Sequence, residues 1–153
     1  EAHEVGPLDL FDNAAALTES RAKRIARSRA FQQRVTDLYQ CRCAACGNAF
    51  RSPAGDLYEI EAAHIVPRGL KGADDARNGL ALCRSHHWAF DRGLFGVGQS
   101  GGIEVPPKVA ALRENRHLTP LVAQTLRPPT DPAFAPAKAA LAWHWSNVFA
   151  RNF

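Results

Sequence analysis

The chain has 153 residues, of which 46% are hydrophobic and 22% charged, with a formal net charge of +4 at pH 7. This balance predicts one globular domain with a sizeable core, excludes an intrinsically disordered chain, and favours anionic partners. No apolar run approaches the roughly 18 residues of a membrane span and no secretory signal pattern opens the chain, so we expect a cytoplasmic protein that does not contact a membrane.

The N-terminal part changes sharply in charge. Residues 1–16 contain four acidic side chains and no lysine or arginine, which predicts a linker or the edge of an upstream domain. A helix is predicted from a cap at Thr18, with Glu19 in its first turn, to about Tyr39. Its apolar residues recur at three- and four-residue spacing, typical of one buried face: Phe31, Val35, Leu38 and Tyr39. Its remaining surface is basic, and it either faces solvent or faces phosphates: Arg21, Lys23, Arg24, Arg27, Arg29 and Arg34.

Strand and loop signals alternate through the middle of the chain. Residues 52–56 predict a loop, and residues 57–65 predict a strand that carries His64 near its end. A loop over residues 67–78 leads to a short returning strand over residues 79–82. A helix is predicted from Arg84 to Arg92, ended by Gly93, and a glycine-rich turn over residues 96–102 joins residues 94–95 to residues 103–105 as a hairpin.

The C-terminal third gives weaker signals. Residues 109–116 predict a short helix, and four prolines between residues 128 and 136 predict an extended segment. Residues 137–149 predict a closing helix whose apolar stripe is Leu141, Trp145, Val148 and Phe149. His3, His117 and His144 are interpreted as surface or packing residues.

The spacing of the cysteines indicates a metal site. Cys43-x-x-Cys46 and Cys83-x-x-His86 each offer two ligands from one turn, and together they can close a tetrahedron around a structural Zn²⁺. The alternative is a set of reduced core cysteines. His87 could replace His86 as the ligand, and spacing alone does not decide between them. The fourth cysteine, Cys41, is expected to be a small buried hydrophobic residue.

Three segments resemble the HNH endonuclease family, in its restriction-type branch. They are Glu61-Ala-Ala-His64-Ile-Val-Pro67, Asn78-Gly-Leu-Ala-Leu-Cys83 and His86-His87-Trp-Ala-Phe-Asp91-Arg-Gly-Leu94. The resemblance covers about residues 39–95. It implies an α+β fold with a small ββα-metal core, a structural zinc clip, an N-terminal basic helix and C-terminal helices. The domain would span residues 17–153, with its core at about residues 39–105.

The resemblance also implies roles for single residues. His64 would be the general base that activates water, and Asn78 would hold its strand in place. His87 and Asp91, one helical turn apart, would hold a catalytic Mg²⁺ or Mn²⁺. Many family members carry a metal-binding Asp or His where this chain has Ala63. Either Asp91 takes over that ligand position or Glu61 reaches in, and Asp91 is favoured because Glu61 and His64 point to opposite faces of their strand.

The function expected from these residues is metal-dependent hydrolysis of double-stranded DNA, as the cleavage domain of a restriction-type enzyme. Because no recognition element is visible, a further domain is expected to read the sequence or a base modification. A homodimer is compatible with this interpretation. The side chains expected to contact DNA are Arg24, Arg27, Arg34 and Arg92. Two alternatives are an HNH nuclease toxin and a zinc-organised module that binds DNA without cutting it.

Overall fold

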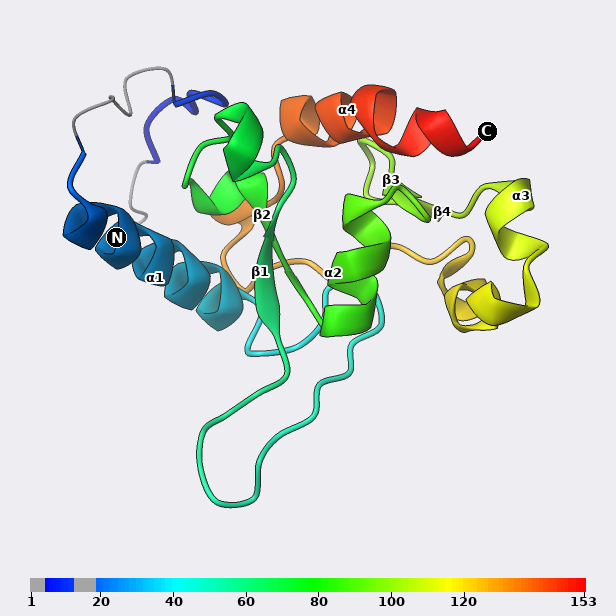
Figure 1. The fold of residues 1–153 in the computed structure, drawn as a ribbon, viewed down its shortest axis with the longest axis horizontal. Coiled ribbons are helices and arrows are strands. Elements are labelled where there is room, and N and C mark those ends of the chain that lie inside the picture. The colour runs from blue at the N-terminus through cyan, green and yellow to red at the C-terminus, as the bar shows by residue number, and fades with distance from the viewer. Residues whose placement is uncertain (1–4, 13–18) are drawn as a thin grey trace.

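The computed structural model describes residues 5–12 and 19–153. A long helix, α1 (Arg21–Leu38), lies beside a two-stranded antiparallel sheet of β1 (Glu61–His64) and β2 (Gly79–Leu82). Helix α2 (Arg84–Asp91) follows β2 directly, so the sheet stands between α1 and α2 (Figure 1). This is the α+β arrangement with a ββα unit that the sequence predicted.

The C-terminal half completes the domain. A second small hairpin, β3 (Gly96–Val97) with β4 (Ile103–Glu104), is followed by α3 (Pro107–Ala110) and then by α4 (Lys138–Asn147). Helix α4 lies over β3 (Figure 1). Among the described residues, no helix combines the length and the apolar character needed to cross a membrane.

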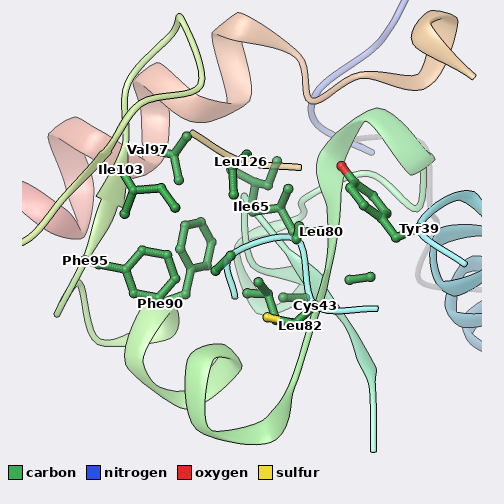
Figure 2. Packing of buried hydrophobic residues seen from close by; sticks show 14 of the residues in the cluster. Tyr39, Cys43, Ile65, Leu80, Leu82, Phe90, Phe95, Val97, Ile103 and Leu126 are labelled. Atoms are coloured by element: carbon green, nitrogen blue, oxygen red, sulfur yellow. The ribbon is translucent and has the colours of Figure 1, made fainter. Parts of the chain in front are cut away.

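A single hydrophobic core joins these elements. The predicted face of α1 is buried, with Phe31 and Val35 at 5% and 0% exposure. Leu80 and Leu82 of β2 and Phe90 of α2 are fully buried, and Figure 2 shows Phe90 and Phe95 packing toward Val97 and Ile103 of the second hairpin. The core therefore fixes the ββα unit from both sides.

The register of the sheet places the site residues. His64 pairs with Gly79 at one end of the sheet, and Glu61 pairs with Leu82 at the other. A Cβ atom at Gly79 would lie 2.6 Å from Cγ2 of Val35 and 2.9 Å from Cζ of Phe31. Helix α1 can therefore pack closely behind His64 only because residue 79 has no side chain.

Several predicted boundaries are wrong. The hydroxyl of Ser20 accepts a hydrogen bond from the backbone N–H of Lys23 and caps α1, so Glu19 precedes the helix; the predicted cap, Thr18, lies outside the described residues. The strand predicted over residues 57–65 forms only from residue 61, because residues 50–59 pair with one another. In the second hairpin the first strand is residues 96–97 rather than residues 94–95.

The C-terminal predictions also need correction. The helix predicted over residues 109–116 divides into α3 and a 3₁₀ segment over residues 113–121, because the Asn115 side chain donates to the Val109 carbonyl and closes α3. The proline-rich segment contains a 3₁₀ turn at residues 132–134, and the closing helix becomes 3₁₀ from Phe149. Leu141 and Phe149 of the predicted stripe are buried, whereas Trp145 and Val148 are half-buried.

The described part of the acidic N-terminal segment contacts the ββα unit. Phe11 pairs with Gly72 as an isolated antiparallel bridge, and the backbone N–H of Asp12 donates to the Lys71 carbonyl at 2.8 Å. Residues 10–12 thus run along the loop that joins β1 to β2.

Candidate active site and metal centre

Three cysteines and one histidine form a compact cluster of metal-binding side chains. The ligand atoms of Cys43, Cys46, Cys83 and His86 all lie within 4.8 Å of one another. Cys43 and Cys46 come from a tight turn after α1, which closes with a 2.8 Å hydrogen bond from the Gly47 N–H to the Cys43 carbonyl. Cys83 is the N-terminal cap residue of α2 and His86 lies in its first turn. The two predicted ligand pairs therefore meet as expected.

The side chains of the cluster perturb one another's protonation, and hydrogen bonds with Cys43 and Cys46 raise the pKa of the Cys83 thiol. Hydrogen bonds from Cys46, Cys83 and His86 hold the pKa of the Cys43 thiol well below its usual range. The sulfurs of Cys43 and Cys46 raise the pKa of His86 to about 9. Three sulfurs and one imidazole nitrogen in this space are the donor set of a closed tetrahedral zinc site.

The structure decides between the two neighbouring histidines. Nδ1 of His86 lies 3.2 Å from the Cys83 sulfur and 3.6 Å from the Cys43 sulfur. His87 points elsewhere and contacts Glu61. Cys41 lies outside the cluster, and the expectation that it is buried is wrong, because it is half-buried in a turn with a φ of 52°.

His64 lies at the C-terminal end of β1, held on two sides. Its ring stacks on Phe31 with centroids 3.9 Å apart, and its Nε2 lies 2.8 Å from a carboxylate oxygen of Asp74. The side chain remains 20% exposed. Burial lowers the pKa of His64, against the opposing effect of the Asp74 carboxylate. This favours the neutral imidazole, which can accept a proton near neutral pH.

The partner of His64 belongs to a larger network of charges. The second oxygen of Asp74 lies 2.6 Å from Nε of Arg27 and 3.5 Å from Nε of Arg68. The two guanidinium groups also contact the Asp12 carboxylate, at 3.4 and 3.2 Å. Arg27 is therefore half-buried between acidic groups, unlike the exposed position that a purely DNA-contacting residue would occupy.

Asn78 is fully buried and fully bonded. Its side-chain oxygen accepts from the Val66 N–H at 2.9 Å, and its amide donates to the carbonyls of Val66 and Ala73 at 3.1 and 3.0 Å. Its backbone carbonyl accepts from the Ile65 N–H. These bonds tie together the two ends of the loop after β1, immediately beside His64. Asn78 thus holds the loop that follows His64, and its role in orienting the base stays a prediction.

His87 of α2 stands between two carboxylates. Its Nδ1 lies 2.7 Å from Glu61, and its Nε2 lies 3.5 Å from Asp91 one turn later. Glu61 thus contacts Nδ1 of His87, and Asp91 lies beside Nε2 on the other side of the ring. Nε2 of His87 and the Asp91 carboxylate are therefore neighbouring candidate ligands for a cation. Partial burial raises the pKa of Asp91, and the nearby His87 and Arg92 oppose this.

The other predicted contact residues lie on α1 and at the C-terminal end of α2. Arg24 is exposed on α1, Arg34 lies 4.5 Å over the Phe134 ring, and Arg92 lies 4.1 Å over the exposed ring of Trp88. Of the remaining histidines, His144 is buried and packs in the core, and His117 is exposed; His3 lies outside the described residues.

Sequence reasoning missed Asp74 and Arg68 and ranked Glu61 behind Asp91. The one available signal was the pair Asp74-Asp75 in the loop before Asn78, since the antiparallel return of β2 must bring that loop back to the end of β1. Nothing in the pattern indicates which of the two carboxylates faces His64.

The sequence and the fold are both similar to those of known proteins. A model of the HNH endonuclease family matches residues 43–98, which include the metal cluster, His64, Asn78 and His87. The solved structure of a modification dependent TagI restriction endonuclease has a similar fold, with a TM-score of 0.60 and 22% identity. The match covers 78% of this chain and 37% of that enzyme's chain. No curated protein matches the sequence.

Proposed function

We propose that this chain cleaves DNA by metal-dependent hydrolysis, with His64 as the general base, and the match of residues 43–98 to the HNH endonuclease family supports this proposal. The observation that carries the proposal is the juxtaposition of His64, Asn78 and His87 on one ββα unit. The environment of each residue suits its role. His64 is partially exposed, the Asn78 amide is buried and hydrogen-bonded, and the His87 ring lies beside the Asp91 carboxylate.

His64 supplies the base. Burial keeps its imidazole neutral at lower pH than an exposed histidine, so the ring can take a proton from water at working pH. Phe31 and Asp74 hold the ring in place, and Asn78 holds the loop that follows it.

His87 and Asp91 are the residues that would hold the catalytic cation. Glu61 fixes the His87 ring through Nδ1, as carboxylates commonly do for metal-binding histidines, and leaves Nε2 directed toward the Asp91 side. Mg²⁺ or Mn²⁺ bound there would neutralise charge on the phosphate and on the leaving 3′ oxygen.

The cysteine cluster would hold a structural Zn²⁺. Its four ligands join the turn after α1 to the first turn of α2 and leave no open coordination position. We expect this ion to stabilise the domain and to take no part in hydrolysis.

Double-stranded DNA is the proposed substrate, within a restriction-type enzyme. Exposed arginines on α1 and at the end of α2 would contact the phosphates. They are Arg24, Arg34 and Arg92. Such contacts position DNA without reading its sequence. The chain spans 37% of the length of the similar TagI restriction endonuclease, which is modification dependent. A separate domain that reads sequence or base modification therefore fits this proposal.

Cleavage of supercoiled plasmid tests the function. Unmodified plasmid and plasmid carrying methylated bases are incubated with the zinc-loaded protein and Mg²⁺ or Mn²⁺. We expect nicking or linearisation by the unaltered protein, none by His64→Ala, and unchanged cleavage by His117→Ala, a matched control at an exposed histidine. Cleavage that persists in His64→Ala contradicts the assigned base. Binding in a gel-shift assay without any cleavage supports the non-catalytic alternative.

A further inference from the structure

The contact between His64 and Asp74 has a consequence for the proton on the imidazole ring. Asp74 is 9% exposed, and both of its carboxylate oxygens are engaged. One oxygen faces Nε2 of His64 at 2.8 Å, and the other forms ion pairs with the guanidinium groups of Arg27 and Arg68. A carboxylate can only accept hydrogen bonds, so the His64 nitrogen that faces it must carry a hydrogen.

We propose that Asp74 is a positioning residue that holds the proton of neutral His64 on Nε2 and leaves the lone pair on Nδ1 as the acceptor for the proton of water. This inference rests on the proposed function, because it specifies which nitrogen of the general base reacts. Phe31 contributes by stacking on the ring face at 3.9 Å, so the imidazole is held by its face and by one edge.

The proton transfer balances with this assignment. The O–H bond of water breaks as its proton joins Nδ1, and the hydroxide oxygen bonds to phosphorus. The bond from phosphorus to the 3′ oxygen then breaks, and that oxygen takes a proton from solvent. The imidazolium that forms keeps its Nε2–H directed at Asp74, whose negative charge stabilises it. The other charged groups that influence His64 are Arg68 and His87, and both disfavour its protonated form.

Two substitutions at Asp74 should have different effects. In Asp74→Asn the amide oxygen should turn toward Arg27 and Arg68, because the positive charge of the two guanidinium groups attracts the oxygen and repels the amide N–H groups. The amide nitrogen then faces Nε2, which must accept, so the proton moves to Nδ1 and the reactive lone pair is lost. In Asp74→Ala no side chain at position 74 fixes the tautomer of His64. Part of the His64 population therefore keeps an unprotonated Nδ1 that can accept the proton of water.

A structural role for Asp74 predicts the reverse order. The isosteric asparagine would preserve the packing and most contacts, and alanine would do more damage. The order of the two variants therefore separates a tautomer effect from a loss of folding. We expect Asp74→Asn to lower the cleavage rate by about 10²- to 10⁴-fold, the range expected when the base holds the wrong tautomer, and Asp74→Ala to lower it by about tenfold.

The matched control is the neighbouring acidic residue. Asp75 also pairs with an arginine, Arg77 at 2.7 Å, but it does not contact His64. Asp75→Asn retains a side chain that can cap the 3₁₀ turn at residues 76–78. We expect it to leave the cleavage rate and the His64 tautomer unchanged.

The direct test is ¹⁵N NMR of the ring nitrogens in zinc-loaded protein labelled at histidine, recorded above the pH at which His64 titrates. We expect the Nε2–H tautomer for His64 in the unaltered protein and in Asp75→Asn, and the Nδ1–H tautomer in Asp74→Asn. An Nδ1–H tautomer in the unaltered protein overturns the inference even if no variant can be purified. Equal cleavage by Asp74→Asn and the unaltered protein also overturns it.

This experiment separates the two levels of the proposal. If no plasmid is cleaved by any form of the protein, the proposed function fails while the tautomer is still measured. If the unaltered protein cleaves and His64→Ala does not, but the tautomer does not respond to Asp74→Asn, only the present inference fails.

Discussion

His144 makes a quantitative prediction about stability in acid. The side chain is 2% exposed, its ring stacks on Phe90 with centroids 3.8 Å apart, and its Nε2 donates to the Phe90 carbonyl at 2.9 Å. Burial penalises the imidazolium and lowers the pKa of His144 to about 4. The folded chain therefore holds a neutral histidine under conditions in which the unfolded chain holds a charged one.

The sign and size of the effect follow from these two pKa values. Between pH 6.5 and pH 4 the unfolded chain binds more protons, so the free energy of unfolding falls as the pH falls. The difference between about 6.5 in the unfolded chain and about 4 in the folded chain limits the effect to about 3 kcal/mol. Of this, about 2 kcal/mol should be lost between pH 7 and pH 5.

Urea unfolding at pH 7, 6 and 5 measures this loss. The variant is His144→Gln, whose amide can still donate to the Phe90 carbonyl but does not titrate. It should be less stable at pH 7, because it loses the ring stacking, and its stability should fall less toward pH 5. His117→Gln, at an exposed histidine, should follow the unaltered protein. Because all three proteins keep the cysteine cluster, protonation of that cluster cancels in the comparison. Parallel pH curves for His144→Gln and the unaltered protein refute the reasoning.

Three further substitutions test the metal cluster, the loop and the close packing behind His64. Cys43→Ser should lower both the bound zinc measured by metal analysis and the melting temperature, whereas Cys41→Ser should retain both; equal zinc in the two variants contradicts the proposed ligand set. Asn78→Ala removes three buried hydrogen bonds and should destabilise the protein by about 2–5 kcal/mol, as measured by thermal unfolding. It should also slow plasmid cleavage without abolishing it, and an unchanged rate argues against an orienting role. Gly79→Ala should cost about 1–3 kcal/mol and reduce cleavage, because the new Cβ displaces the Phe31 ring that stacks on His64; full activity would mean that the ring can move without consequence.

Local patterns predicted the parts of the site that local geometry determines. The spacing of Cys43 and Cys46, and of Cys83 and His86, encodes two turns, and each turn presents two ligands whatever surrounds it. The same holds for His87 and Asp91, which one helical turn brings together. These pairs were found because their residues are close in the chain.

Contacts made by loops were missed for the opposite reason. Asp74 reaches His64 only because the loop after β1 folds back, and that path depends on the bonds of Asn78 and on the pairing of residues 10–12 with residues 71–73. The hydrophobic periodicity of a sequence does not predict the path of a loop. The strand predicted over residues 57–65 is shorter for the same reason. Residues 57–59 pair with residues 50–52 in a hairpin, and the turn between the two segments sets this pairing.

The basic face of α1 shows how charge can mislead. The sequence presents Arg27 as one member of a positive surface, yet its guanidinium contacts Asp74, Asp12 and Glu19. A helical pattern gives the face on which a residue lies and not what the tertiary fold places against that face. Arg27 thus contacts Asp74, the partner of His64, and the proposed phosphate contacts of α1 would be made by exposed neighbours such as Arg24.

The adjacent residues His86 and His87 explain how one short helix can contribute to both the cysteine cluster and the proposed catalytic site. Successive side chains on a helix point about 100° apart. His86 therefore turns to the cysteines while His87 turns to Glu61 and Asp91. Since Cys83 caps α2 and joins the same cluster, a bound ion would clamp the first turn of the helix and set the rotation of α2 about its own axis. The bound zinc would then determine where His87 points without approaching the substrate. Loss of the zinc should therefore slow cleavage even at temperatures where the chain remains folded.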